Sequence, residues 1–324
     1  MLKQIIPLDP ATYKNHHIHS GERIWAETNC YVDLWIELLH AFGYAPEAAL
    51  SFTLSIDFEG DQWTFFKFPL ADLYSLYGMD VQELAIWKPV VEHVEEQVGL
   101  GRPVLVELDS FYLPDTAGTA YQIEHVKTTV AVNEIDIDKN RMGYFHNQGY
   151  FAIEGDDFRK VFHLDGLTDP AFLPPYVEFV KMSGNTCCSA NDLRGESVRQ
   201  LRRQLKMLPS VNPFAGFKAR FEKDLTWLTN SEIETFHKYS FATLRQYGAC
   251  YELAATYLQW LKGEGEDGLD LAIDEFLDIS NGAKALQFQL ARAVNRKKAL
   301  DLSPLDVAGN KWENAISIMR QIYN

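Results

Sequence analysis

Cys30 is the side chain whose type and position best suit chemistry. Apolar residues recur over residues 31–42 at the spacing of one helix face, so a helix capped by Thr28 or Asn29 is predicted there. Cys30 then falls in the first helical turn, where unpaired backbone N–H groups and the helix dipole stabilise a thiolate. With a base nearby, such a thiolate is a nucleophile; without one, Cys30 is a small apolar residue of the core.

His125 supplies a candidate base for that nucleophile. It opens a hydrophobic strand predicted over residues 126–132. A histidine on a strand is held rigidly and can point at the first turn of a helix that packs on the same sheet. We therefore interpret Cys30 and His125 as a nucleophile–base pair.

The residue that orients His125 is sought at the end of the neighbouring predicted strand. Asn147 is the preferred candidate, because an amide oxygen accepts a hydrogen bond from an imidazole N–H without competing for its proton. His146 is the alternative orienter, and the two side chains point to opposite faces if both lie on the strand. Asp136 and Asp138 are further candidates for the same role.

The surrounding sequence resembles that of papain-like cysteine enzymes. The matching features are Asn29-Cys30 with its helix, residues 101–106 and 109–114, His125 at the start of a strand, and residues 156–158 after a hairpin. Over residues 15–165 the chain resembles the N-terminal domain of butirosin biosynthesis protein H. Over its full length it resembles an uncharacterised bacterial family encoded near amino acid–carrier-protein ligases.

The resemblance implies a papain-like fold and an acyl-transfer reaction. Cys30 would take an aminoacyl group from the phosphopantetheine thioester of a carrier protein, and His125 would move the protons. The acceptor, a small molecule or a peptide, is not specified. Phosphopantetheine would arrive with the substrate, so no resident cofactor is expected.

One feature of papain-like enzymes is missing from the sequence. These enzymes place an oxyanion-hole glutamine several residues before the cysteine, and residues 22–28 contain none. The Cys30 backbone N–H, together with Asn29 or a neighbouring side chain, is expected to serve instead.

Three other functions are compatible with the Cys30–His125 pair: two would use it in catalysis and one would not. A cysteine peptidase or amidase would employ the Cys30–His125 pair with water as the acceptor, and a thioesterase would release the acyl group from the carrier. A non-catalytic protein would bind a carrier or a metabolite without turning it over.

The periodicity of apolar residues divides the chain into two predicted domains. Residues 1–168 are predicted to form a papain-like α+β domain, in which a helix bearing the cysteine packs on an antiparallel sheet bearing the histidine. Residues 169–324 are predicted to form an all-α domain. The predicted strands cover residues 51–58, 62–68, 104–108, 121–132, 142–146 and 150–153; the C-terminal helices are predicted over 192–207, 213–228, 231–262, 269–279, 283–298 and 304–322.

The distribution of charge restricts the partners. The net charge of −15 argues against nucleic acid, and residues 1–168 hold 26 acidic but only 11 basic side chains, which favours an amine-bearing substrate. Two basic clusters of the second domain are candidate docking sites for an acidic carrier protein, although solvated helix faces explain them equally well. They are Arg199, Arg202, Arg203 and Lys206, and Arg292, Arg296, Lys297 and Lys298.

The remaining motifs indicate neither a metal nor a membrane. His16-His17-x-His19 is a possible ligand group, but the nearest carboxylate, Glu22, gives no recognised spacing, so no metal is expected. Cys187-Cys188 lacks the C-x-x-C spacing, and Cys250 reads as a structural residue. No signal peptide or membrane span is evident, and a cytoplasmic location is expected.

Overall fold

The described residues form two compact units. The computed structural model describes residues 1–324 apart from 21–22, 26, 167–172, 184–189, 298 and 324. The α/β unit comprises Met1–Ser20, Asn29–Pro46 and Leu73–Cys187, and the helical unit comprises Gly21–Thr28, Glu47–Asp72 and Cys188–Asn324. The predicted fold class, α+β with a helical C-terminal region, is confirmed. The two units interleave along the chain, whereas the sequence predicts a single boundary at residue 168.

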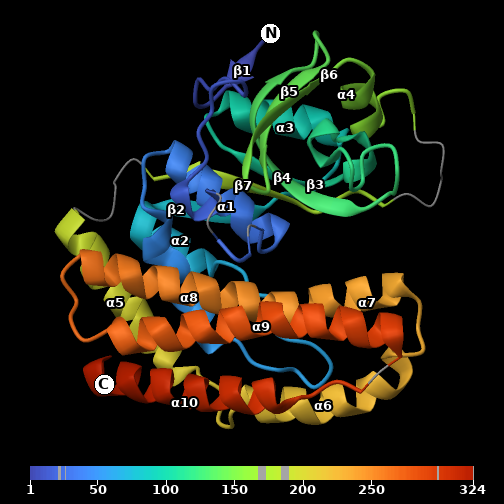
Figure 1. Cartoon of the computed structure of the whole chain (residues 1–324). Coiled ribbons are helices and arrows are strands. Elements are labelled where there is room, and N and C mark those ends of the chain that lie inside the picture. Colours follow the sequence, from blue (N-terminus) through green and yellow to red (C-terminus); the bar gives the residue numbers. More distant parts are fainter. Residues whose placement is uncertain (21–22, 26, 167–172, 184–189, 298, 324) are drawn as a thin grey trace. The chain divides into compact units, whose positions relative to one another are not determined.

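The α/β unit is built on one antiparallel sheet, drawn mainly in green in Figure 1. Its strands are β1 (Lys3–Gln4), β2 (Met79–Glu83), β3 (Val104–Asp109), β4 (Lys127–Asp136), β5 (Arg141–His146), β6 (Gly149–Glu154) and β7 (Val177–Met182). In the described residues the strand order is β2-β7-β3-β4-β5-β6, and β1 adds to β4. Helices α1 (Cys30–Ala41), α3 (Val90–Gly99) and α4 (Asp156–Val161) belong to this unit, as do the short 3₁₀ turns η1 (His17–His19), η3 (Ser110–Tyr112) and η4 (Pro114–Thr116).

Opposite faces of the sheet are covered by α3 and α1. Residues of α3 share a hydrophobic core with Val104, Val106 and alternate residues of β4 and β5. The intervening residues point to the other face, because side chains alternate along a strand. On that face the α1 hydroxyl of Tyr31 donates to Glu178 of β7 (2.9 Å), and α1 packs against β4, β5 and β6.

Helix α1 is buried from Tyr31 to Leu39, including two carboxylates, Asp33 and Glu37. His19 lies between them: its Nδ1 bonds to Glu37, and its Nε2 lies 3.4 Å from Asp33 Oδ1. All three side chains are fully buried. Tyr13 also donates its hydroxyl to Glu37 (2.6 Å). The segment before α1 thus supplies partners for the carboxylates that the helix buries.

The helical unit consists largely of long packed helices. They are α5 (Ala190–Lys206), α6 (Pro213–Leu228), α7 (Ile233–Ser240), a π-helical turn η5 (Phe241–Arg245), α8 (Gln246–Gly263), α9 (Asp270–Arg296) and α10 (Ser303–Tyr323). Figure 1 shows α9 lying between α8 and α10, and α10 also packs against α6. The 3₁₀ segment η2 (Pro46–Ser55) lies almost wholly in this unit, and α2 (Leu70–Tyr77) spans the border between the units.

Two strand predictions are wrong, because the segments concerned have no ladder partner. Residues 46–55 form 3₁₀ turns, in which Thr53 and Ser55 donate their hydroxyls to the carbonyls of the residues three positions earlier. Residues 62–68 make only an isolated bridge, between Phe58 and Trp63. Apolar runs of this length do not distinguish a strand from another buried segment.

Three other elements differ from expectation. Strand β4 begins at Lys127, and residues 121–123 form a turn, so His125 precedes the strand by two residues. Helix α9 continues through residues 279–283, where a break is predicted, because Ser280 and Ala283 are buried in the helix interface. Strands β2 and β7 are not foreseen, since they pair across about a hundred residues of chain.

None of the helices in the described residues has both the length and the apolar character that a membrane crossing requires.

His19→Ala is expected to destabilise the α/β unit by about 3–5 kcal/mol, because two buried carboxylates lose the imidazole that lies between them. Urea denaturation measures the loss, and His237→Ala, which removes an exposed imidazole from α7, is the matched control. Equal midpoints for the two variants would contradict the role given to His19.

The same cluster predicts a loss of stability at high pH. Burial lowers the pKa of His19, but its bonds with Asp33 and Glu37 raise it more, so the pKa lies above the usual 6.5. Stabilisation is therefore complete below about pH 6.5 and is lost as the pH rises through the raised folded value. The free energy of unfolding, measured against pH, should decline over this range in the natural protein and not in His19→Ala.

Candidate active site

Cys30 is the first residue of α1, as predicted. Asn29 caps the helix in an extended conformation, and its side-chain oxygen accepts a hydrogen bond from the Val32 N–H (2.9 Å). The Cys30 thiol is free and partly exposed. The first N–H groups of a helix lack partners within the helix, so they attract negative charge to this position.

His125 is bound to a carboxylate that lies next to it in the sheet. Its Nδ1 is 2.6 Å from Oδ2 of Asp109, the last residue of β3. An ionised carboxylate only accepts hydrogen bonds, so Nδ1 carries the proton and Nε2 is left as the basic nitrogen. The His125 side chain is 64% exposed and that of Asp109 is 29% exposed. This is the arrangement of a general base held by an acid.

The local structure explains why these two residues meet. Asp109 is in register with Lys127 at the start of β4, and Ser110 ties the strand ends together by donating both its N–H and its hydroxyl to the Val126 carbonyl. The other oxygen of Asp109 accepts the Phe111 N–H (3.0 Å). The Phe111 ring then stacks on the imidazole of His125, with centroids 4.2 Å apart. The Asp109 carboxylate and the His125 ring are therefore both fixed in orientation.

Asp109 lies on the face of the sheet on which the cysteine helix packs. Leu108 belongs to the α3 core, so Asp109 has the parity of the opposite face, on which α1 packs. In the part of the chain that the structure describes, no hydrogen bond joins Cys30 Sγ to the His125 ring. Catalytic hydrogen bonds often form only when substrate binds.

The two predicted orienters lie elsewhere. His146 faces the α3 side, where its Nδ1 bonds to Asp115 (2.5 Å) and its Nε2 to the Thr128 hydroxyl (2.7 Å). Asn147 occupies the turn between β5 and β6 with a φ of +46°. Neither contacts His125, whose partner is Asp109. The alternatives Asp136 and Asp138 contact the amino group of Met1.

Asp109 was missed because the orienter was sought after the histidine in the sequence. The residue lies 16 positions before His125, in the segment 109–114 that carries the family resemblance. Asp109 ends one strand and His125 lies just before the next. Both therefore lie at the same end of an antiparallel strand pair. This antiparallel order is the signal that could have identified it.

His19 also lies beside α1, but its contacts do not suit a base. Asp33 follows Cys30 by three residues, so the two share one side of the helix. Both ring nitrogens of His19, however, face carboxylates of Asp33 and Glu37, which keeps the imidazole protonated. The cluster is a structural charge network.

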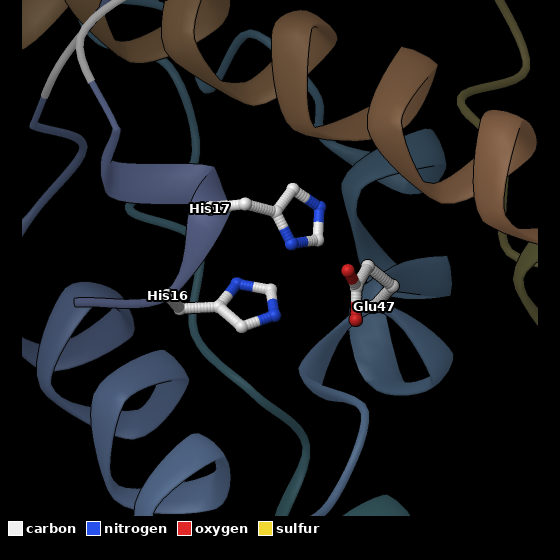
Figure 2. A group of neighbouring side chains, drawn as sticks. All are labelled: His16, His17 and Glu47. Carbon is white, nitrogen blue, oxygen red and sulfur yellow. The ribbon is translucent and has the colours of Figure 1, made fainter. Parts of the chain in front are cut away.

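His16 and His17 lie side by side, with ring centroids 4.2 Å apart, as Figure 2 shows. Burial and the neighbouring His17 lower the pKa of His16 to about 3, so its imidazole is neutral. Glu47, also drawn in Figure 2, belongs to the helical unit. Within the α/β unit, as far as the structure describes it, His16 and His17 offer two of the three or four protein ligands that zinc takes. Glu22, to which the sequence points, lies outside the described residues.

Cys250, the other cysteine that the structure describes, offers no nucleophile. Cys250 is fully buried in α8, its thiol donates to the Thr53 carbonyl (3.4 Å), and burial raises its pKa. It is therefore inert, as predicted. Cys187 and Cys188 lie outside the described residues.

The fold and site now allow the chain to be assigned to a class of proteins. It matches the DUF1839 N-terminal domain over residues 14–182 and the DUF1839 C-terminal domain over residues 190–321. It therefore belongs to the DUF1839 family, with the cysteine helix and the Asp109–His125 pair in the N-terminal domain. No curated protein matches the chain.

Asp109→Ala is expected to remove the preference of His125 for the tautomer with the proton on Nδ1. With the carboxylate gone, the proton is no longer fixed on Nδ1, and nitrogen NMR above the titration range of imidazole will show a mixture of tautomers. Asn147→Ala is the control and should leave the Nδ1–H form intact. The same Nδ1–H tautomer in both variants would show that Asp109 does not orient the ring.

Proposed function

We propose that this protein is a papain-like cysteine acyltransferase with Cys30, His125 and Asp109 as its triad. The observation that carries the proposal is the 2.6 Å bond between His125 Nδ1 and Asp109, which fixes the proton on Nδ1 and makes Nε2 the basic nitrogen. The resemblance to the N-terminal domain of butirosin biosynthesis protein H supplies the reaction class. The donor is then an aminoacyl thioester of a carrier protein.

The reaction has two balanced steps. In the first, the Cys30 thiolate attacks the thioester carbonyl; the bond to the pantetheine sulfur breaks, and that sulfur takes the proton of the His125 imidazolium. In the second, an amine attacks the Cys30 thioester, His125 Nε2 accepts the amine proton, and the Cys30 thiolate leaves. Asp109 stabilises the imidazolium in both steps. One thioester is exchanged for another, so the first step is nearly neutral in energy.

The negative charge on the tetrahedral carbonyl oxygen needs hydrogen-bond donors. The Cys30 backbone N–H meets this need, because it lies at the start of α1 and has no intrahelical partner. Asn29, whose side-chain oxygen caps the helix, is the second donor candidate at this position.

The helical unit offers one basic surface for an acidic carrier protein. Arg292, Arg296 and Lys297 at the end of α9 are exposed and form no ion pair within the described residues. In the other predicted cluster, Arg203 is bound to Asp72 by two 2.6 Å bonds and Arg199 to Glu196. The α9 surface is therefore the better docking candidate. Lys298 lies outside the described residues.

Loss of transfer in the triad variants tests the proposal. The donor is an aminoacyl-pantetheine thioester, the acceptor is hydroxylamine, and the acyl-enzyme is detected by mass spectrometry. Cys30→Ala should abolish the acyl-enzyme, and Asp109→Ala should slow transfer by roughly 10³–10⁴-fold because the base loses its orientation. Asn147→Ala should stay within about threefold of the natural protein, since this residue does not contact His125.

Three outcomes contradict the proposal in different ways. Release of free amino acid that hydroxylamine does not divert identifies a thioesterase, and cleavage of fluorogenic peptides identifies a peptidase. If the natural protein forms no acyl-enzyme and Cys30 alkylates only as an ordinary thiol does, near pH 8.5, the chain is a binding protein.

A further inference from the structure

A buried histidine and a buried aspartate join the sheet to the loop that ends at His125. His146 of β5 lies with its Nδ1 2.5 Å from Oδ2 of Asp115 and with its Nε2 2.7 Å from the Thr128 hydroxyl. The side chains of His146 and Asp115 are only 2% and 3% exposed. The proposed reaction assigns neither of them a role, and burying such a pair costs free energy unless its hydrogen bonds are made. The contacts of the pair therefore show what it holds together.

Asp115 binds the loop to β5 through both of its oxygens. Its Oδ1 accepts the hydroxyl of Tyr144 (2.5 Å), which lies two residues before His146 on the same strand. Burial, together with the charge of Asp115, raises the pKa of Tyr144, so the hydroxyl keeps its proton and donates it. Because side chains two residues apart on a strand point to one face, Tyr144 and His146 reach the carboxylate from the same face of the sheet. The turn η4, to which Asp115 belongs, is therefore fixed against the sheet.

Hydrogen bonds within the loop connect η4 with the Asp109–His125 pair. Thr116 of η4 donates its hydroxyl to the carbonyl of Ser110 (3.0 Å), the first residue of η3. Phe111, the next residue, stacks on the His125 ring and donates its N–H to Asp109. A displacement of η4 would therefore shift both the ring and the N–H that orient the pair.

The Nε2 contact of His146 reaches the strand that follows His125. Thr128 is the second residue of β4, three positions after His125. It is in register with Leu108 of β3, which directly precedes Asp109. His146 thus contacts η4 through one nitrogen and the start of β4 through the other, so it links the loop to the strand at which the loop ends.

We infer that the Asp115–His146 pair positions the loop of residues 110–124 and thereby keeps the Asp109 carboxylate and the His125 ring aligned for proton transfer. His146 and Asp115 are thus positioning residues of the active site, although His146 lies on the face of the sheet opposite to Asp109. The role rests on the proposed function, in which His125 moves the protons. All of these contacts lie within the α/β unit.

Substitutions of two partners of Asp115 test this role. His146→Leu removes both hydrogen bonds of the imidazole, and Tyr144→Phe removes only the hydroxyl bound to Asp115 while it keeps the ring. Asn133→Leu is the matched control. Asn133 is also a buried polar residue of β4, but its amide donates to the Tyr150 hydroxyl (3.1 Å) and not to the loop.

Two measurements on the full chain distinguish positioning from mere stabilisation. Nitrogen NMR of the His125 ring, above the titration range of imidazole, should show the Nδ1–H tautomer in the natural protein and in Asn133→Leu, and a mixture of tautomers in His146→Leu. Transfer from the aminoacyl-pantetheine thioester to hydroxylamine should fall roughly 10²-fold in His146→Leu, as for a misplacement of about 1 Å, with KM nearly unchanged. Tyr144→Phe should give the same changes to a smaller extent, and it decides the test if His146→Leu does not fold.

The outcomes separate this role from the proposed function. If His125 keeps the Nδ1–H tautomer in both His146→Leu and Tyr144→Phe, or in Tyr144→Phe where His146→Leu does not fold, the inference fails while transfer by the natural protein still supports the function. If Asn133→Leu changes the tautomer as much as His146→Leu does, the buried pair only stabilises the fold and the inference also fails. If the natural protein transfers no acyl group, the proposed function fails, and the tautomer alone then shows whether the pair orients His125.

Discussion

The burial of two carboxylates on α1 is the constraint on which the α/β unit depends. Asp33 and Glu37 lie on a helix that is covered on all sides, and unpaired charges in such a place would prevent folding. His19 and Tyr13 supply the partners, so the chain before the helix must return along it. That requirement fixes α1 against the sheet, and with α1 it fixes the backbone of the nucleophile.

The sequence predicted correctly a feature that depends on interactions between residues close together in the chain. The start of α1 could be predicted because the Asn29 cap and the apolar stripe act within a few residues of each other. The partner of His125 could not be predicted in this way, since Asp109 meets it through the register of β3 and β4. The strand prediction that overlaps residues 46–55 was wrong for a related reason. The conformation of a buried apolar run depends on the segments that pack around it.

The two units are formed from interleaved segments of the chain. The α/β unit carries Cys30, Asp109 and His125. Residues 21–28 and 47–72 of the N-terminal half belong to the helical unit. Segments of this unit therefore flank the cysteine helix on both sides in the sequence. A cut of the chain at residue 168 would therefore leave each product with exposed surfaces that the other half normally buries.

The membership of residues 21–28 in the helical unit also has a consequence for the time at which that unit becomes complete. In this segment Trp25 donates its indole N–H to Ser280, 255 positions farther along the chain, and its backbone N–H to Glu252, 227 positions farther. Chains are synthesised from the N-terminus, and contacts of such long range form late in folding. Trp25 therefore emerges from the ribosome long before the helices that bind it, so a nascent or truncated chain carries this side chain without its partners.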